Sequence, residues 1–260
     1  MNEIELRIEG LKKHFGGVKA IDGLSFSVHG NELIGLIGPN GSGKTTTINT
    51  INGLLKPTSG EVYFQGDRID QLPAYERAKR GLGRTFQVTR VFRRLSVFQN
   101  LVVPALALAK ASRKEIQARA RQVMSFLTIE HLAEENAQNL SGGQQKLLEL
   151  GRVLMLDPFI IFLDEPFAGV HPELLRQIYD YIKEIHQRGK AFIIVSHDMD
   201  TIFDLSQRVI VISEGKKIAD GEPDAVRNEE AVIDAYLGEA SEKEQLEDAT
   251  ITGGDENAGG

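Results

Sequence analysis

The chain has 260 residues, of which 41% are hydrophobic and 26% charged, a balance that excludes collagen-like and largely disordered proteins. It contains no cysteine, which excludes a disulfide scaffold, thiolate metal sites and a thiol nucleophile. No apolar run reaches the ~18 residues needed to span a bilayer, and the first ten residues contain no signal core. We therefore expect a soluble intracellular protein of one large domain or two small ones.

Four strands are predicted in the first quarter of the sequence. Residues 4–11 and 24–28 are predicted to be short strands, and residues 32–38 form a compact apolar strand that ends in glycine. A further strand at 61–65 follows a Pro-Thr-Ser-Gly turn.

The middle of the sequence changes to helical spacing. Helices are predicted from about residue 104 to 126 and again at 144–156, where the apolar residues fall on one face. Residues 88–150 therefore look like a helical block inserted into a different structure.

The last third returns to strands. Continuous apolar runs at 160–164 and 192–196 are typical of strands buried on both faces of a parallel sheet. Between them, Pro172 and Gly189 bracket a helix with one apolar face, and residues 208–221 predict a hairpin. Strands that alternate with helices indicate an α/β core.

The net charge of −7 is distributed unevenly. Residues 239–260 carry seven acids and one base, a net charge of −6, so we expect a disordered tail there. Between Glu76 and Glu115, ten bases occur without one acid, which favours a partner-binding surface over an ordinary solvated face. These bases are Arg77, Lys79, Arg80, Arg84, Arg90, Arg93, Arg94, Lys110, Arg113 and Lys114.

The segment GPNGSGKT at 38–45 fits the phosphate-binding pattern G-x-x-x-x-G-K-[ST], between an apolar strand and a plausible helix. Glycines let backbone N–H groups turn toward phosphate oxygens, and the following helix adds its positive N-terminal end. Lys44 can reach the β- and γ-phosphates, and the Thr45 hydroxyl is placed to ligate Mg²⁺. The nucleotide-binding residues expected here are Gly38, Pro39, Asn40, Gly41, Ser42, Gly43, Lys44, Thr45 and Thr46.

Two adjacent carboxylates, Asp164 and Glu165, close the apolar run at 160–164. A single acid at a strand end could be only a helix cap. Two can divide the work, because Asp164 can hold Mg²⁺ while Glu165 polarises an attacking water. A nucleotide-binding switch would not need the second acid, so ATP hydrolysis is favoured over binding alone.

The segment LSGGQ at 140–144 is, by itself, a good helix start with exposed amides. Together with the phosphate-binding loop and IIFLDEP at 160–166, it makes residues 4–238 resemble ABC transporter nucleotide-binding subunits. In that family the signature sequence LSGGQ of one subunit closes over the ATP held by a second subunit, so two chains enclose two ATP molecules. The resemblance adds four nucleotide-binding residues: Ser141, Gly142, Gly143 and Gln144.

The resemblance implies the P-loop NTPase fold, an α/β core of mainly parallel sheet with an antiparallel β subdomain and an inserted helical subdomain. Residues 1–87 and 151–238 would form the ATP-binding core and the β subdomain. Residues 88–150 would form the helical signature subdomain, followed by the acidic tail at 239–260.

Further site residues follow from the family pattern. Phe15, with Val18 nearby, matches the aromatic position that stacks on adenine. Gln87, at the end of an expected strand RTFQ, matches the Q-loop glutamine that senses Mg²⁺ and the attacking water, and His197 matches the switch histidine at the γ-phosphate. The resemblance thus implies catalytic roles for Glu165, His197 and Gln87, and Mg²⁺ ligation by Thr45, Gln87 and Asp164.

One position departs from the family pattern. The D-loop commonly ends in Asp, whereas this chain has AGVH, with His171 in that place. The departure concerns communication between the two ATP sites and leaves ATP binding itself unaffected.

The segments 81–103, 167–173 and 235–240 resemble the ATPase subunits of branched-chain amino acid importers. Lipopolysaccharide-export ATPases share FRRLSV and FAGV and stand as the alternative. The family places membrane-spanning permease subunits against residues 88–103, at the cytoplasmic face of the membrane, and a solute-binding protein takes part only indirectly. We expect exposed Val91, Phe92, Leu95 and Phe98 to grip the permease, with Arg90, Arg93 and Arg94 orienting it.

Other classes of ATPase each lack a defining feature here. DNA-repair or chromosome ATPases share the phosphate loop and the signature but need long heptad arms, and only about 90 residues separate Thr45 from Leu140. A translation-factor relative would carry two cassettes, and a metabolite kinase has no use for LSGGQ. We therefore predict ATP-driven transport with a second, identical or paralogous, ATPase subunit and no nucleic-acid partner.

Overall fold

The computed structural model describes residues 5–108 and 111–236. The predicted acidic tail at 239–260, most of AYLGEA at 235–240 and Lys110 of the basic run lie outside the described residues.

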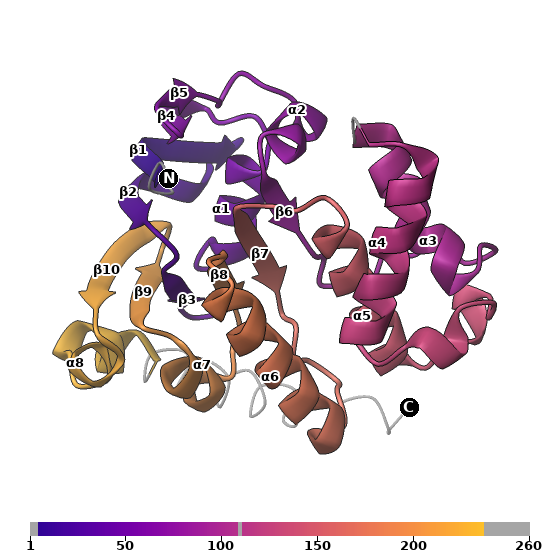
Figure 1. The fold of residues 1–260 in the computed structure, drawn as a ribbon. Helices are drawn as coiled ribbons and strands as arrows, with labels where there is room; N and C mark the ends of the chain where they lie inside the picture. Colours follow the sequence, from indigo (N-terminus) through magenta and orange to yellow (C-terminus); the bar gives the residue numbers. More distant parts are fainter. Residues whose placement is uncertain (1–4, 109–110, 237–260) are drawn as a thin grey trace, which may run out of the picture.

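A six-stranded sheet in the order β10-β9-β3-β8-β7-β6 forms the centre of the molecule (Figure 1). Five strands are parallel, and β10 pairs antiparallel with β9 at one edge. All residues of β3, β7 and β8 are buried, as predicted for strands covered on both faces. The strands are β3 (Leu33–Ile37), β6 (Leu82–Arg84), β7 (Ile160–Asp164), β8 (Ala191–Val195), β9 (Arg208–Ser213) and β10 (Lys216–Gly221).

A second, antiparallel sheet has the order β2-β1-β4-β5. Its strands are β1 (Glu5–Phe15), β2 (Val18–His29), β4 (Ser59–Phe64) and β5 (Asp67–Arg68). The first two strands are longer than predicted because the pairing continues through register shifts after Ile8 and Leu11. Those irregularities break the two-residue alternation that sequence analysis depends on.

Helices cover one face of the main sheet and form a block beside its β6 edge (Figure 1). In the part of the chain that the structure describes, no helix is both long and apolar enough to cross a membrane. The helices are α1 (Lys44–Ile51), α2 (Ala74–Lys79), α3 (Val97–Leu108), α4 (Arg113–Phe126), α5 (Gly142–Leu154), α6 (Pro172–Gln187), α7 (Met199–Leu205) and α8 (Pro223–Arg227).

The predicted helix at 104–126 is two helices, α3 and α4. Helix α3 begins at Val97 and contains Pro104. Ser112 and Glu115 then form a capping box that starts α4, the arrangement that satisfies two backbone donors at a helix start. The sequence S-x-x-E at 112–115 carries the signal for this boundary.

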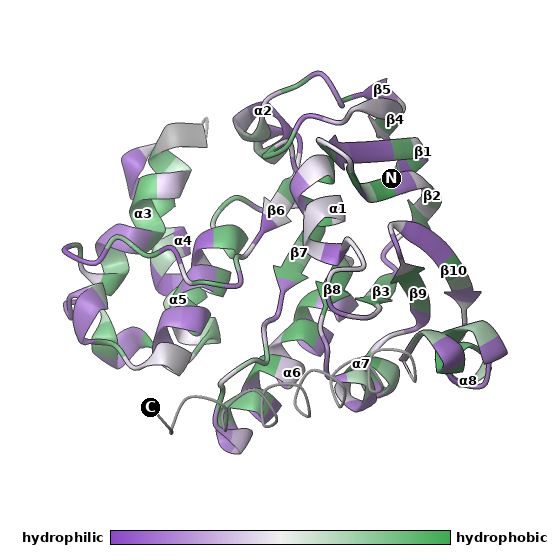
Figure 2. Cartoon of the chain, turned by 180° about the vertical axis from the view of Figure 1, so that it is seen from behind, coloured by the Kyte–Doolittle hydropathy of each residue, from purple (hydrophilic) through white to green (hydrophobic). Residues whose placement is uncertain are grey.

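Alternate residues of the main sheet belong to two hydrophobic cores. Ile34, Leu36 and Phe162 pack with α1 and the antiparallel sheet, whereas Ile37 and Leu163 pack with the helices on the other face. Figure 2 shows the hydrophobic residues concentrated in β3, β7, β8 and β9 between these layers. The sheet is therefore held rigidly from both sides, which fixes the loops at its carboxyl edge.

Arg77 does not belong to the predicted basic surface. It is 1% exposed, and burial lowers the pKa of its guanidinium to about 10. Its donors hold backbone carbonyls of four residues, including two at the end of α1, and are therefore satisfied inside the protein. The acceptors belong to Thr50, Ile51, Asp70 and Leu72.

The predicted exposure of the apolar residues near the Q-loop is only partly confirmed, and their contact with a permease stays a prediction. Phe92 is 43% exposed, but Val91 and Phe98 are partly buried against the main core and Leu95 is only half-exposed. A short run without regular periodicity gives no information about which apolar side chains turn inward.

We propose the division of the chain given above, with residues 1–87 and 151–238 as core and β subdomain and 88–150 as helical subdomain. Helix α5 crosses the boundary at 150 and ends at Leu154. The inserted block is thus continuous with the core through one helix.

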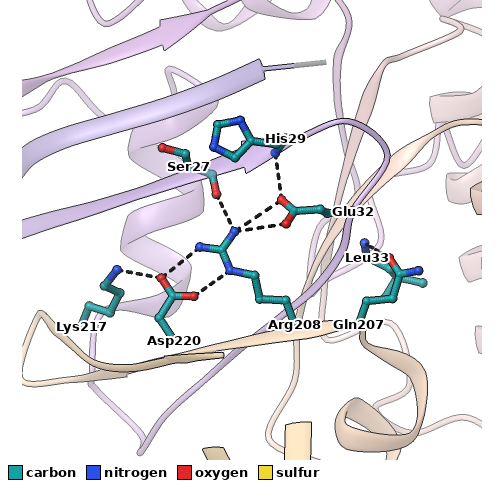
Figure 3. A network of polar contacts seen from close by, with 8 residues as sticks. All are labelled: Ser27, His29, Glu32, Leu33, Gln207, Arg208, Lys217 and Asp220. Atoms are coloured by element: carbon teal, nitrogen blue, oxygen red, sulfur yellow. Dashed lines mark hydrogen bonds and ion pairs between the residues drawn. The ribbon is translucent and has the colours of Figure 1, made fainter. Parts of the chain in front are cut away.

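Arg208 on β9 joins the edge strand β10 to the β2–β3 connection (Figure 3). Its Nε lies 2.7 Å from Asp220 Oδ1 and its Nη1 lies 3.3 Å from Glu32 Oε1. Nη1 also donates to the Ser27 carbonyl oxygen at 3.0 Å, and Glu32 accepts the His29 N–H at 2.8 Å. One partly buried guanidinium therefore links both sheets.

We expect Arg208→Met to lower the free energy of unfolding by about 2 kcal/mol, because charge-assisted hydrogen bonds to both sheets are lost. Urea denaturation measures this change. The matched control, Arg227→Met, removes a 3.8 Å ion pair to Asp200, whose side chain is 96% exposed, and should cost less than about 1 kcal/mol. Equal losses in the two variants would contradict a special role for Arg208.

Candidate ATP site

The phosphate-binding loop connects β3 to α1 and approaches its neighbours closely. Gly38 has φ 149° and Gly43 has φ 104°. A Cβ at Gly38 would lie 1.9 Å from the Ile212 carbonyl oxygen, and one at Gly43 would lie 2.2 Å from the Ala20 carbonyl oxygen. Only glycine fits at either position, so the loop is fixed between β2 and β9.

Lys44 begins α1 and is buried. Its Nζ donates to the carbonyl oxygens of Gly38 at 2.7 Å and Pro39 at 2.9 Å. Phosphate oxygens are stronger acceptors for an ammonium than these neutral carbonyls. No described side chain caps the start of α1, and the positive end of the helix dipole there favours an anion.

A cavity of about 260 Å³ brings together four separate segments. Gln87 comes from the loop after β6 and Glu165 from the end of β7, and both face the phosphate-binding loop. The remaining lining residues are Ala20, Asn40, Gly41, Gly43, Lys44, Thr45 and Thr46. The structure thus groups Gln87, Glu165 and six residues of the predicted phosphate-binding loop around one space. The other predicted residues, His197, Gly38, Pro39 and Ser42, do not line it.

Asp164 forms a buried ion pair with Arg84, a residue that sequence analysis assigned to the basic surface. Arg84 Nη2 lies 3.0 Å from Asp164 Oδ2, and Nη1 donates to Asn49 Oδ1 at 2.6 Å. Burial raises the pKa of the Asp164 carboxyl, although Arg84 and the Thr45 hydroxyl act in the opposite direction. Asp164 Oδ1 is buried without a hydrogen-bond partner.

That orphaned oxygen, with Thr45 nearby, fits one position in the coordination shell of a magnesium ion, which prefers hard oxygen ligands. In the part of the chain that the structure describes, no group of three His, Asp or Glu side chains could hold a metal. Magnesium would therefore need oxygen ligands from a bound phosphate group as well, as phosphate-loop sites commonly provide.

Glu165, the next residue along the chain, forms a close pair with His197. His197 Nδ1 lies 2.8 Å from Glu165 Oε2, and the Ser196 hydroxyl donates to the same oxygen at 3.5 Å. Glu165 has φ 51° and its N–H donates to the Val195 carbonyl, so the turn that aims this carboxylate adopts a conformation uncommon for a non-glycine residue. His197 is 67% exposed and accessible to a ligand.

Gln87 lies outside strand β6, contrary to the prediction of a strand RTFQ. The strand ends at Arg84, and Gln87 is exposed in the following loop. Phe15 and Val18 pair across the β1–β2 turn and are 47% and 67% exposed. Neither lines the cavity, so adenine stacking on Phe15 stays a prediction.

The signature sequence begins α5 and opens to solvent. Ser141 and Gln144 form a capping box, Ser141 and Gly142 are exposed, and a Cβ at Gly143 would lie 2.0 Å from Leu174 Cδ2. None of residues 141–144 lines the cavity. This chain therefore does not bring its own signature to its own phosphate-binding loop.

Sequence analysis missed two charged residues of α5, Lys146 and Glu149. Lys146 Nζ donates to the backbone carbonyls of Glu165, Pro166 and Ala168. Glu149 is 5% exposed, and burial raises the pKa of its carboxyl to about 7. Its position among buried leucines, in LLEL, was the available signal.

Residues 21–168, more than half of the chain, match the family model described as ABC transporter. The chain belongs to the ABC transporter ATP-binding family. A second model, described as branched-chain amino acid ATP-binding cassette transporter, matches residues 216–242.

Full-length relatives agree with this assignment. The chain is 34% identical over 244 residues to the probable branched-chain amino acid transport ATP-binding protein LivG of Archaeoglobus fulgidus, covering 90% of this chain and 95% of that protein. It is 36% identical over 234 residues to the lipopolysaccharide export system ATP-binding protein LptB of Haemophilus influenzae, covering 90% and 97%.

Solved structures share the fold. An ATP-binding cassette of an ABC transporter in its ADP conformation superposes with a TM-score of 0.82 at 36% identity, covering 92% of this chain and 100% of that one. A dimeric cassette bound to ADP and Pi has a TM-score of 0.77 at 26% identity, covering 84% and 98%. The predicted α/β fold and ABC family are confirmed. The chain is a nucleotide-binding ABC ATPase whose family works with a second cassette and a membrane permease.

We expect Arg84→Met to destabilise the protein by about 3–5 kcal/mol at neutral pH, because it leaves the Asp164 charge buried and unpaired. Without its counter-ion, Asp164 titrates at a still higher pKa in the folded state than in the unfolded state. The ionised carboxylate then lowers stability, so the loss should be small near pH 4 and grow as pH rises. Urea denaturation across this pH range measures the trend.

The control is the double variant Arg84→Met with Asp164→Asn, which removes the charge as well as its partner. Its destabilisation should not grow with pH. A pH-independent loss in the single variant would show that Arg84 acts through packing and not through Asp164.

Proposed function

We propose that this chain is the ATP-hydrolysing subunit of a branched-chain amino acid importer, working at the cytoplasmic face of the membrane. The observation that supports the substrate class is the match of residues 216–242 to the branched-chain amino acid cassette model. Overall identity does not separate this proposal from lipopolysaccharide export, because the LivG and LptB relatives are similarly close.

In the proposed ATP site, two chains enclose each nucleotide. One chain contributes the phosphate-binding loop, and the other contributes the exposed α5 start with Ser141 and Gly142. Phe15 stacks on adenine, and Lys44 with the open α1 start binds the phosphates. Thr45, Gln87 and Asp164 hold Mg²⁺, which neutralises phosphate charge.

Hydrolysis requires a base aligned with an attacking water. Glu165 accepts the proton as the water oxygen bonds to the γ-phosphorus and the bond to the ADP oxygen breaks. His197, 2.8 Å from the Glu165 carboxylate, keeps this carboxylate oriented and reaches the γ-phosphate with its other ring nitrogen. Gln87, which lines the same cavity, positions the water.

The permease would bind beside the Q-loop. A cavity of about 400 Å³ lies there, between the core and the helical block, and it is lined by Phe86, Arg90, Phe92 and Arg152 among others. Arg152 lies over the Phe92 ring at 4.7 Å and Arg90 over the Phe86 ring at 4.2 Å. Aromatic faces flanked by cations suit a short amphipathic helix of a membrane protein. A solute-binding protein would act through the permease, and no nucleic acid is involved.

We expect Glu165→Gln to retain ATP binding but to lower the hydrolysis rate by roughly 10²–10⁴-fold, because the amide cannot accept a proton. Since ATP then persists between two chains, the variant should elute as an ATP-dependent dimer in size-exclusion chromatography. Ser141→Arg in the same background is the matched control, because it leaves the phosphate-binding loop intact and should prevent the dimer. Hydrolysis by Glu165→Gln at the wild-type rate would assign the base elsewhere.

Arg93→Glu with Arg94→Glu should abolish cellular uptake of radiolabelled leucine, because both exposed bases orient the permease in our proposal. ATPase activity of the isolated double variant should remain, and co-purification of the permease should weaken. Arg113→Glu with Lys114→Glu changes equally exposed bases on α4 and should leave uptake normal. If loss of this chain impairs lipopolysaccharide delivery and spares leucine uptake, the export alternative is correct.

A further inference from the structure

Helix α5 carries two charged side chains directly after the signature, Lys146 and Glu149. They are three residues apart and therefore lie on the same face of the helix. Both point into the protein and contact backbone atoms. Each contacts a different catalytic segment.

Lys146 holds the segment that carries the catalytic base. Its Nζ donates to the carbonyl oxygen of Glu165 at 3.1 Å, of Pro166 at 3.1 Å and of Ala168 at 2.6 Å. An ammonium has three donors, and all three are used on this one turn. The turn and α5 therefore move together unless three charge-assisted bonds break.

Glu149 holds the segment that carries Gln87. Its Oε1 accepts the backbone N–H of Phe86 at 3.3 Å and of Arg90 at 3.3 Å. The carboxylate therefore binds the Q-loop, the segment around Gln87, on both sides of that residue. The Thr89 hydroxyl adds a bond to Gln145 Oε1 at 3.3 Å. The cavity enclosed by α5, this loop and Glu165 measures only about 20 Å³, room for about one water.

We propose that Lys146 and Glu149 are positioning residues that make α5 a rigid linkage between the signature of this chain and its own Glu165 and Gln87. The inference rests on the proposed function, in which that signature contacts the ATP held by the partner. Capture of the partner's ATP is thereby transmitted to the hydrolysis site of the capturing chain. This route does not need the D-loop position, which His171 occupies.

The linkage predicts that the two ATP sites of a dimer respond differently to loss of Lys146. A lysine with a merely structural role would not give this difference. Removing Lys146 should impair hydrolysis at the site whose Glu165 belongs to the same chain. It should spare the site to which that chain contributes only its signature. A lysine that shapes the signature would give the reverse pattern, and one needed for folding would impair both sites.

Mixing experiments separate the two sites, because chains with Glu165→Gln supply a signature but no active base. A limiting amount of wild-type chain is mixed with an excess of about tenfold of E165Q chain, so that mass action drives mixed dimers. The ATPase rate per wild-type chain is the reference. Two test mixtures are compared with this reference. In the first, a limiting amount of K146M chain is mixed with excess E165Q chain. In the second, a limiting amount of wild-type chain is mixed with excess K146M/E165Q chain.

We expect the first mixture, with K146M in the chain that hydrolyses, to lose at least about tenfold in kcat, because small displacements of a reacting group are costly. Its KM for ATP should hardly change, since the phosphate-binding loop is intact. The second mixture should stay within about twofold of the reference, the usual effect of a neutral substitution. Equal rates in all mixtures, or a larger loss in the second, would overturn the linkage.

Further variants test the same claim. K146R retains a cationic donor and should recover most of the lost rate, and E149L, which removes the Q-loop acceptor, should reproduce the one-sided loss. Lys183→Met, on the exposed side of α6, is the matched control and should behave as wild type. Failure of K146R to recover any activity, or a two-sided loss in E149L, counts against the linkage. Absence of any reference rate would overturn the proposed function and the linkage with it.

Discussion

The site depends on the parallel alignment of β3, β8, β7 and β6. Their carboxyl ends lie at one edge of the sheet, so the phosphate-binding loop, His197, Glu165 and Gln87 emerge side by side although up to 159 residues separate them in the chain. Burial of every residue in β3, β8 and β7 fixes that edge. The turn that carries Glu165 starts from this fixed edge and is held further by Lys146 and His197.

Much of this arrangement could be predicted from local patterns. Several local patterns each predict a structure that tertiary packing does not change. They are the apolar runs at 160–164 and 192–196, the glycine spacing at 38–45 and the S-G-G helix start. Strand ends and exposure were predicted less well. The strand before Gln87 ends at Arg84, whose side chain bonds to Asp164 and Asn49, partners that are distant in sequence.

The arginines show why charge alone is a poor guide to surfaces. Arg77 binds backbone carbonyls in the interior, Arg84 neutralises a carboxylate beside the proposed metal position, and Arg208 links the two sheets. Arg77 and Arg84 occur in sequence among other bases, and Arg208 begins the apolar strand β9. A guanidinium has five donors and a long apolar stem, so it can be buried wherever enough oxygen acceptors converge.

The exposed start of α5 bears on when the cell spends ATP on this protein. In the proposed dimer, each chain contributes only half of each catalytic centre, because its signature does not lie at its own phosphate-binding loop. The rate of ATP hydrolysis then depends on how often two cassettes meet and on any scaffold that holds them face to face. In this proposal a single copy can fill with ATP and remain idle until it meets a second cassette.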